Sequence, residues 1–130
     1  MSLIMFDVDH FRKINDTHGH IAGDYVLRRL AFLLNDKIRK EERFSRYGGE
    51  EFVIVMPESA VDRAHTFAEK AREVVMASEF VFGGQDIPVT ISLGVGEMVA
   101  THFTAVDFLQ SIDQALYAAK RGGRNRVERD

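Results

Sequence analysis

The sequence predicts a single domain of the α/β class. Three observations support this prediction: short apolar runs that end in acids or glycines, three longer stretches with apolar residues at helical spacing, and a Gly-Gly turn between two apolar runs. The 130 residues, 45% of them hydrophobic, are enough for one core and too few for two. No repeat, low-complexity tract or internal linker divides the chain. We therefore expect one unit that mixes crossover helices with hairpins.

The first half of the chain predicts a strand, a short helix and a long helix. The apolar run SLIMFDVDH, residues 2–10, is short enough to favour a buried strand, and its acids mark the carboxyl end. HFRKIND predicts one or two helical turns, which the glycines of THGHIAG break. A long helix then begins near Asp24 and is ended by RKEER, residues 39–43. Its apolar residues at helical spacing are Val26, Leu27, Leu30, Leu34 and Ile38.

The strongest hairpin signal is FSRYGGEEFVIVM, residues 44–56, which predicts two strands around a Gly-Gly turn. A second amphipathic helix follows, which Ser59 or Asp62 can cap. Its apolar stripe is Ala64, Phe67, Ala68, Ala71, Val74 and Val75.

The last third of the chain predicts a short strand, a Gly-Gly loop, a half-buried strand and a third helix. In the half-buried strand every second residue is apolar: Ile87, Val89, Ile91, Leu93 and Val95. The third helix spans about Thr104 to Lys120 and ends at the basic segment RGGRNRV. Its apolar stripe is Val106, Leu109, Ile112, Leu116 and Ala119.

Composition excludes several classes of function. The net charge of -3 gives no overall attraction to nucleic acid or to an anionic membrane. Without cysteine the chain has no disulfide and no thiolate metal site, which is compatible with a cytoplasmic location. No apolar run approaches the roughly 20 residues of a membrane span, and no secretory signal begins the chain. Any metal must be held by oxygen or imidazole.

Two acidic clusters are candidates for a metal site. Asp7 and Asp9 lie two residues apart, so an extended chain points both carboxylates to one face. Asp9 could equally cap the next helical turn, whereas burying Asp7 unpaired would be costly. Glu50 and Glu51 at a hairpin tip would by themselves favour an ordinary solvated turn. Together, the two clusters offer hard oxygen ligands of the kind that suit Mg²⁺ or Mn²⁺ bound with substrate phosphates.

A basic cluster near the C-terminus could bind those phosphates. Its residues are Lys120, Arg121, Arg124 and Arg126. Cations at the end of a helix also complement the helix dipole, and this structural role is favoured for Lys120 and Arg121. It is weaker for Arg124 and Arg126, which follow the glycines. The spacing is not that of a Walker motif, and we interpret His18 and His20 as solvated loop residues.

These residues coincide with the motifs of a known family. The segments FDVDHFRKINDTHGHIAGDYVL, RYGGEEF, VTISLGVG and ALYAAKRGGRNRV resemble, in order, the successive motifs of the GGDEF domain of diguanylate cyclases, with GGEEF as the signature variant. The resemblance covers nearly all of residues 1–130. It implies a ferredoxin-like, nucleotidyl-cyclase-like central sheet, mainly antiparallel and flanked by helices, with the active site at a β-hairpin.

The resemblance also implies a role for each site residue. Asp7, the Val8 carbonyl and Glu50 would bind Mg²⁺ or Mn²⁺, Glu50 would help deprotonate the attacking 3′-hydroxyl, and Glu51 would be a second required acid. Gly48 and Gly49 would leave room for the nucleotide. Asn15 and Asp24 would hydrogen-bond guanine, although Asn15 could be a turn residue and Asp24 a helix N-cap. The β- and γ-phosphates would be bound by Arg12, Lys120 and Arg124.

The implied reaction is the condensation of two GTP molecules into cyclic di-GMP with release of pyrophosphate, by two-metal phosphoryl transfer. One domain offers one GTP site, so the resemblance implies that a homodimer is needed for catalysis. It also implies a sensory or regulatory domain elsewhere in the full-length protein, which could anchor it to a membrane. The alternative is a catalytically silent module that binds GTP and regulates a neighbouring domain.

Two departures from the family pattern qualify these expectations. The DxLTGLxNR-like helical segment is not found before Leu3, so we expect an N-terminally truncated domain. The product-inhibition motif RxxD corresponds here to RKEE, from Arg39 to Glu42. Because glutamate places its carboxylate one methylene farther out, we expect this inhibitory site to bind product weakly.

Overall fold

The computed structural model describes residues 1–99 and 104–130. Its strands form a five-stranded sheet of order β2-β3-β1-β6-β7 and a two-stranded sheet of β4 and β5. The strands are β1 (Ser2–Val8), β2 (Arg43–Arg46), β3 (Glu51–Met56), β4 (Val81–Phe82), β5 (Gln85–Asp86), β6 (Ile91–Glu97) and β7 (Val127–Arg129). The helices are α1 (Phe11–His18), α2 (His20–Asn35), α3 (Val61–Ala77) and α4 (Ala105–Arg121).

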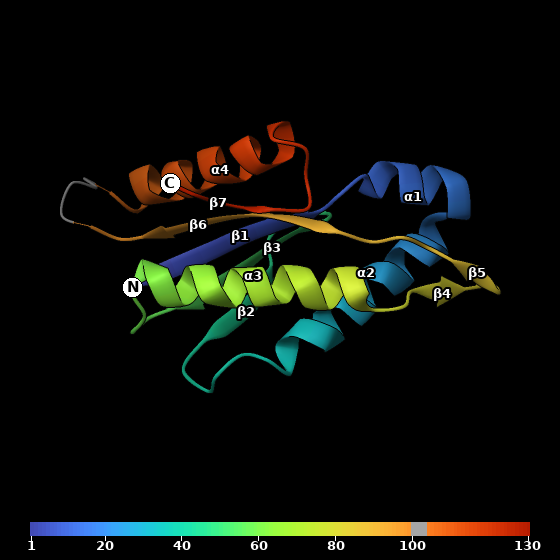
Figure 1. Cartoon of the computed structure of the whole chain (residues 1–130), viewed down its shortest axis with the longest axis horizontal. Helices are drawn as coiled ribbons and strands as arrows, with labels where there is room; N and C mark the ends of the chain where they lie inside the picture. Colours follow the sequence, from blue (N-terminus) through green and yellow to red (C-terminus); the bar gives the residue numbers. More distant parts are fainter. Residues whose placement is uncertain (100–103) are drawn as a thin grey trace.

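The large sheet is mainly antiparallel, which confirms the predicted fold class. β1 lies between β3 and β6 and pairs with both in antiparallel fashion, as β2 does with β3, whereas β6 and β7 pair in parallel. In Figure 1, α4 lies on one side of the strands, and α2 and α3 lie on the other. The termini lie near one end of the sheet, and α1 lies at the other end (Figure 1).

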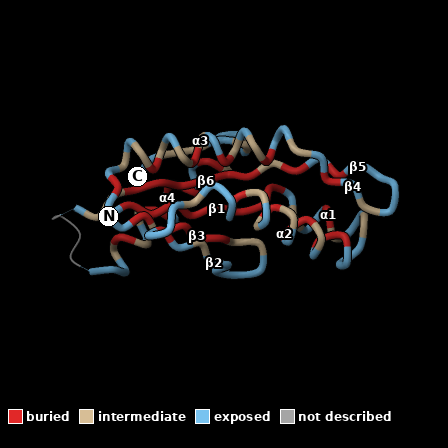
Figure 2. The backbone as a smooth tube through the Cα atoms, turned by 90° about the horizontal axis from the view of Figure 1, so that it is seen from below, coloured by how far each residue is buried: buried red, intermediate tan, exposed pale blue. Residues whose placement is uncertain are grey.

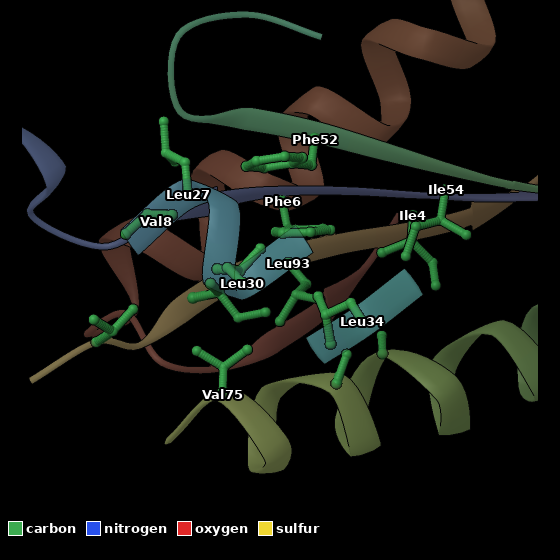
Figure 3. Packing of buried hydrophobic residues seen from close by; sticks show 14 of the residues in the cluster. Ile4, Phe6, Val8, Leu27, Leu30, Leu34, Phe52, Ile54, Val75 and Leu93 are labelled. Atoms are coloured by element: carbon green, nitrogen blue, oxygen red, sulfur yellow. The ribbon is translucent and has the colours of Figure 1, made fainter. Parts of the chain in front are cut away.

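Alternation along β1 divides the core between the two faces of the sheet. Ile4, Phe6 and Val8 pack with α2 and α3 in the larger cluster, while Leu3 and Met5 pack against α4. Figure 3 shows the larger cluster, in which the Phe6 ring stacks on Phe52 with the ring centroids 5.2 Å apart. Burial is concentrated in β1, β3 and β6, whereas the outer turns of the helices are exposed (Figure 2).

The prediction of a half-buried strand over residues 87–95 is wrong in two respects. The strand β6 begins only at Ile91, and its residues 91–96 are buried on both faces. Ile91, Leu93 and Val95 belong to the larger cluster, as expected. The other face carries Gly94, where a Cβ would lie 2.5 Å from both the Ile112 carbonyl oxygen and the Leu116 nitrogen of α4. Because glycine lets the α4 backbone approach directly, this face is covered although it shows no apolar signal.

Helix α2 begins earlier and ends earlier than predicted. It starts at His20 directly after Gly19, which has φ 92, and it ends at Asn35. Asp24 therefore lies inside the helix, so the alternative role of Asp24 as its N-cap is wrong. The segment 39–43 lies beyond the helix end, although Ile38 still packs against the core.

In the two later helices, the start predicted for α4 is confirmed and the caps predicted for α3 are wrong. Thr104 caps α4 in a reciprocal arrangement with Asp107, and the Thr104 side chain accepts from the Asp107 amide. Helix α3 instead begins after Ala60 without a side-chain cap, so neither Ser59 nor Asp62 plays that role. Ser59 is buried, and its hydroxyl accepts from Arg63. Val106, predicted as a core residue, is 60% exposed because it lies in the first turn of α4 on the outer face.

Between α3 and β6, Gly83 and Gly84 adopt φ 61 and φ 78 and join β4 to β5 as a tight hairpin. Among the described residues, no helix is both long enough and apolar enough to cross a membrane.

Candidate functional site

A cleft of about 470 Å³ lies at the carboxyl end of β1. It is bordered by the β1–α1 connection, the tip of the β2–β3 hairpin and the end of α4 with the loop that follows. The structure thus brings together many of the residues predicted for the site. Those that line the cleft are Asp7, Val8, Arg12, Glu50, Lys120 and Arg124.

Strand register explains why the acids meet here. Asp7 on β1 is directly opposite Glu51 on β3, so the two side chains lie on the same face of the sheet. The preceding residues of that face, Leu3 and Met5, pack against α4. The Val8 amide donates to the Glu50 carbonyl at 3.3 Å, which holds the hairpin tip against the end of β1.

Asp7 is buried and only partly satisfied. Its Oδ2 accepts from the Lys120 ammonium in an ion pair at the end of α4. Its Oδ1 is buried and has no hydrogen-bond partner in the described part of the chain. Burial raises the pKa of Asp7, Lys120 opposes this effect, and the negative charges of Glu50 and Asp113 add to it. An unpaired carboxylate oxygen in such a place favours a cation as its missing partner.

The donors around Asp7 fit a hard divalent cation. Two carboxylates, those of Asp7 and Glu50, and the Val8 backbone border one cleft. Within residues 1–99 and 104–130, no three or more His, Cys, Asp or Glu side chains are grouped as a metal site. A cation here would therefore take one or two carboxylates and complete its shell with backbone, water or phosphate oxygens, as Mg²⁺ commonly does.

Glu51 experiences the same accumulation of negative charge. It is partly buried, and burial raises its pKa, with further contributions from the charges of Asp7, Asp113 and Glu50 and opposition from Lys120. Asp113 had not been predicted as part of this region. The spacing offers a signal for it, since Asp113 precedes Lys120 by seven residues and two helical turns bring both to one face of α4.

The glycines of the hairpin tip do not adopt positive φ, so they are not required by that backbone conformation. A Cβ at Gly49 would meet nothing within 4 Å, and one at Gly48 would only touch Glu51 at 3.5 Å. The Arg46 guanidinium donates to the carbonyl oxygens of Gly48 and Gly49 at 2.6–3.1 Å and fixes the turn. The tip is thus a hydrogen-bonded turn with open space above Gly49.

Asn15 and Asp24 do not line this cleft. Asn15 lies on α1, and its Oδ1 is buried with no hydrogen-bond partner among the described residues. A Cβ at Gly23 would overlap this oxygen, so the Asn15 amide packs directly on the α2 backbone beside Asp24. Asp24 itself is exposed and borders a neighbouring cleft of about 410 Å³, together with Arg46 of the hairpin. Sequence reasoning did not single out Gly23, although it lies against Asn15.

The two roles considered for Asp9 are both unsupported. Helix α1 has no side-chain cap at its start, so Asp9 is not a cap. Its carboxylate is buried and accepts from the hydroxyls of Thr90 and Ser92 and from the Asn125 amide. Both Asp9 oxygens are therefore already engaged within the protein.

The predicted cations differ in their surroundings. Arg12 and Arg124 are exposed at the cleft, whereas Lys120 is half-buried against Asp7. Arg121 lies over the Tyr117 ring at 5.6 Å, in keeping with a structural role, and Arg126 donates to the Arg124 carbonyl at 3.4 Å.

The segment from Arg39 to Glu42 is tied into the fold. The Glu42 side chain is 1% exposed; it accepts from the Arg39 amide at 2.7 Å and pairs with Arg63 of α3 at 2.6 Å. Both Glu42 carboxylate oxygens are already engaged within the protein, which is a further physical reason to expect weak product binding at this motif. Weak binding there stays a prediction.

Comparison with known proteins identifies the family. The family profile "Diguanylate cyclase, GGDEF domain" matches residues 1–126. The chain is 39% identical to diguanylate cyclase A of Treponema denticola over 127 residues, which cover 98% of this chain and 34% of that protein. It is 42% identical to the response regulator PleD of Caulobacter vibrioides over 129 residues, covering 98% of this chain and 28% of PleD. The chain thus spans about a third or less of these relatives.

Solved structures agree. The GGDEF domain of DgcB from Caulobacter crescentus, in complex with c-di-GMP, matches with a TM-score of 0.93 and 35% identity, covering 98% of this chain and 76% of that one. The active GGEEF domain of a diguanylate cyclase from Vibrio cholerae matches with a TM-score of 0.90 and 37% identity, covering 98% and 81%. The order of the sequence motifs, the mainly antiparallel sheet and the cleft at the GGEEF hairpin have the same explanation: the chain belongs to the diguanylate cyclase GGDEF domain family.

Proposed function

We propose that this domain is a diguanylate cyclase that condenses two GTP molecules into cyclic di-GMP and releases pyrophosphate. The observation that carries the proposal is the cleft in which Asp7 and Glu50 face Arg12, Lys120 and Arg124. Phosphoryl transfer requires carboxylates that can hold a divalent metal ion, placed beside basic side chains that can bind a triphosphate. Relatives that are named diguanylate cyclases, at 38–40% identity over nearly the whole chain, support the same reaction.

The Asp7 and Glu50 carboxylates and the Val8 carbonyl oxygen would hold Mg²⁺ or Mn²⁺ in this proposal. When bound, such an ion supplies positive charge that acidifies a hydroxyl and offsets the negative charge of the phosphates. The unpartnered Asp7 Oδ1 supports this assignment, because the oxygen is buried without a donor. The raised pKa values of Asp7 and Glu51 support it too, since a cluster of carboxylates is relieved by a cation.

The remaining residues bind and orient the nucleotide. Arg12 and Arg124 are exposed at the cleft and would bind the β- and γ-phosphates together with Lys120. The free space above Gly48 and Gly49 would admit the nucleotide against bare backbone. Guanine would be recognised by the Asn15 amide and the Asp24 carboxylate, whose chemistry complements O6, N1–H and the N2 amino group of the base. The buried, unpartnered Asn15 Oδ1 supports this role.

Glu50 would accept the proton of the attacking 3′-hydroxyl, because it is the acid of the hairpin tip that borders the cleft. Glu51 would act as a second acid beside Asp7. Since the cleft serves one GTP, the hydroxyl must come from the GTP of a second copy, and two domains must face each other. We also propose an attached regulatory domain, because the curated relatives are far longer than this chain, and a cytoplasmic location, where GTP is supplied.

The test uses the chain fused to a dimeric coiled coil and incubated with GTP and Mg²⁺, with cyclic di-GMP followed by chromatography. Glu50→Gln should lower turnover about a hundredfold or more, because it removes both a proton acceptor and a carboxylate charge. Glu58→Gln, in the exposed turn that follows β3, is the matched control and should keep the rate.

Equal rates for the two variants would show that the role given to Glu50 is wrong. If the native forced dimer bound GTP and made no cyclic di-GMP, the enzymatic proposal would fail, and the chain would be a silent GTP-binding regulatory module.

A further inference from the structure

The loop between α4 and β7 has an unusual backbone. Three consecutive residues adopt positive φ: Gly123 at 119°, Arg124 at 64° and Asn125 at 46°. Glycine adopts such values freely and asparagine tolerates them, but arginine does so at a cost of about 1–2 kcal/mol. In Figure 1 this loop lies beside the connection from β1 to α1. A conformation of this kind persists only where surrounding contacts enforce it.

Asp9 supplies the first of those contacts. Its Oδ2 accepts from the Asn125 amide at 2.9 Å and from the Thr90 hydroxyl at 2.7 Å, while its Oδ1 accepts from the Ser92 hydroxyl at 2.6 Å. Asp9 is 6% exposed, and its own amide donates to the Thr90 carbonyl at 2.9 Å. The Asp9 carboxylate is therefore held in place by Thr90 and Ser92 while it also accepts from the loop.

The Asn125 side chain supplies the second contact, from the opposite side. Its Oδ1 accepts from Arg72 of α3 at 3.4 Å, and its amide nitrogen lies 3.2 Å from the Met76 sulfur on the same helix. The backbone is also held by two further bonds: the Arg124 amide donates to the Ala119 carbonyl at 3.0 Å, and the Leu93 amide donates to the Arg126 carbonyl at 3.0 Å. Arg124 lies between these fixed points with its side chain exposed at the cleft.

We propose that Asp9 and Asn125 are positioning residues for Arg124. Together they hold the loop in its positive-φ conformation, so that the Arg124 guanidinium is directed over the cleft before the nucleotide arrives. This inference rests on the proposed function, because it requires that the cleft bind a triphosphate. Lys120 precedes the strained segment and is held by α4, so the effect is confined to Arg124. Preorganisation matters here because a free arginine loses much rotamer entropy when it binds phosphate.

The experiment measures equilibrium binding of 3′-deoxy-GTP, which lacks the attacking hydroxyl, and of GMP, which lacks the β- and γ-phosphates. Both ligands are titrated in the presence of Mg²⁺ into four proteins. These are the native chain, the Asp9→Asn variant, the Arg124→Ala variant and the double variant. We expect Asp9→Asn to weaken 3′-deoxy-GTP about tenfold and to leave GMP within twofold. In the Arg124→Ala background the same substitution should change 3′-deoxy-GTP binding less than twofold.

A second pair of variants tests the backbone directly and applies if Asp9→Asn does not fold. Asn125→Gly keeps access to positive φ and keeps the amide that donates to Asp9, whereas Asn125→Ala disfavours that φ. Asn125→Ala should lose more affinity for 3′-deoxy-GTP than Asn125→Gly, and only where Arg124 is present.

The positioning role would be overturned by any of three results. These are equal losses of affinity with and without Arg124, equal losses of affinity for the two nucleotides, or no loss of affinity at all. Arg124→Ala by itself separates the two levels of the argument. If it leaves 3′-deoxy-GTP binding unchanged, the phosphate role in the proposed function fails and the positioning role fails with it. If it weakens binding while the Asp9 and Asn125 variants do not, only the positioning role fails.

Discussion

Asp7 illustrates how a single residue can be costly for the fold and useful for the site. The Asp7 side chain is 9% exposed, one carboxylate oxygen pairs with Lys120, and the other has no partner among the described residues. Burial dominates over Lys120, so the pKa of Asp7 is raised. A residue selected only for stability at this position would be neutral, since β1 otherwise buries apolar side chains on both faces.

The raised pKa of Asp7 determines the direction in which the free energy of unfolding changes with pH. The ordinary pKa of Asp7 is 3.8, and the folded protein binds the proton more tightly than the unfolded chain does. The Asp7 contribution to the free energy of unfolding is therefore fully present below pH 3.8 and is lost as pH rises through the raised folded pKa. Asparagine does not titrate, so the stability of the native protein relative to Asp7→Asn should fall as pH rises from below 3.8 through the raised pKa of Asp7.

Urea unfolding of both proteins in chelator, at a series of pH values, measures this difference. A difference that stayed constant or rose with pH would contradict the assigned shift.

At the scale of elements, the contact between β6 and α4 positions the cations that we propose bind phosphate. Gly94 lets the α4 backbone approach the sheet, and α4 carries Lys120 and leads directly into the loop of Arg124. The hairpin of β2 and β3 is different, because its glycines face open space. Glycine thus allows close packing of β6 on α4, whereas at the tip of the β2–β3 hairpin it leaves open space.

This contrast predicts that two glycine-to-alanine substitutions differ in their effect on stability. Gly94→Ala should lower the free energy of unfolding by about 1–3 kcal/mol or more, because its Cβ would meet α4 backbone atoms at 2.5 Å. Gly49→Ala should change it by less than about 0.5 kcal/mol, because nothing lies within 4 Å and φ is not positive. It should nevertheless weaken 3′-deoxy-GTP binding, if the space above Gly49 belongs to the nucleotide.

Urea unfolding and nucleotide titration of the same samples provide the measurements. Comparable destabilisation by both substitutions would refute the distinction between the two glycines.

At the scale of the whole molecule, the described residues bring Asp7, Glu50, Lys120 and Arg124 together in the same cleft, which has room for one set of these groups per domain. The proposed condensation joins two GTP molecules, so it needs a second copy in a facing orientation. The cyclase rate per domain should therefore rise with domain concentration and level off once dimers predominate.

Fusion to a dimeric coiled coil should remove this dependence. Initial rates over a range of domain concentrations, combined with sedimentation analysis, provide the measurement. A rate per domain that remained constant where the chain is monomeric would exclude catalysis between two copies.

Much of the fold was predictable because its signals are local. Helical spacing identified the three long helices, the Gly-Gly turn identified the hairpin, and Thr104 marked the start of α4. The errors share a cause: β6 was expected to be half-buried and Asp24 to begin α2, because neither the packing of Gly94 on α4 nor the helical start after Gly19 has a periodic signal.

The sequence by itself determined the family, the order of the elements and the residues that gather at the hairpin, because these depend on motifs and short-range periodicity. Only the tertiary structure decided what Asp9, Lys120 and Glu42 do. Asp9 meets Asn125 across 116 positions and Lys120 meets Asp7 across 113, while Glu42 meets Arg63 of a different element. Such contacts follow from the placement of β1 between β3 and β6 and from helices packed on both faces of the sheet, and the local pattern of a chain does not encode them.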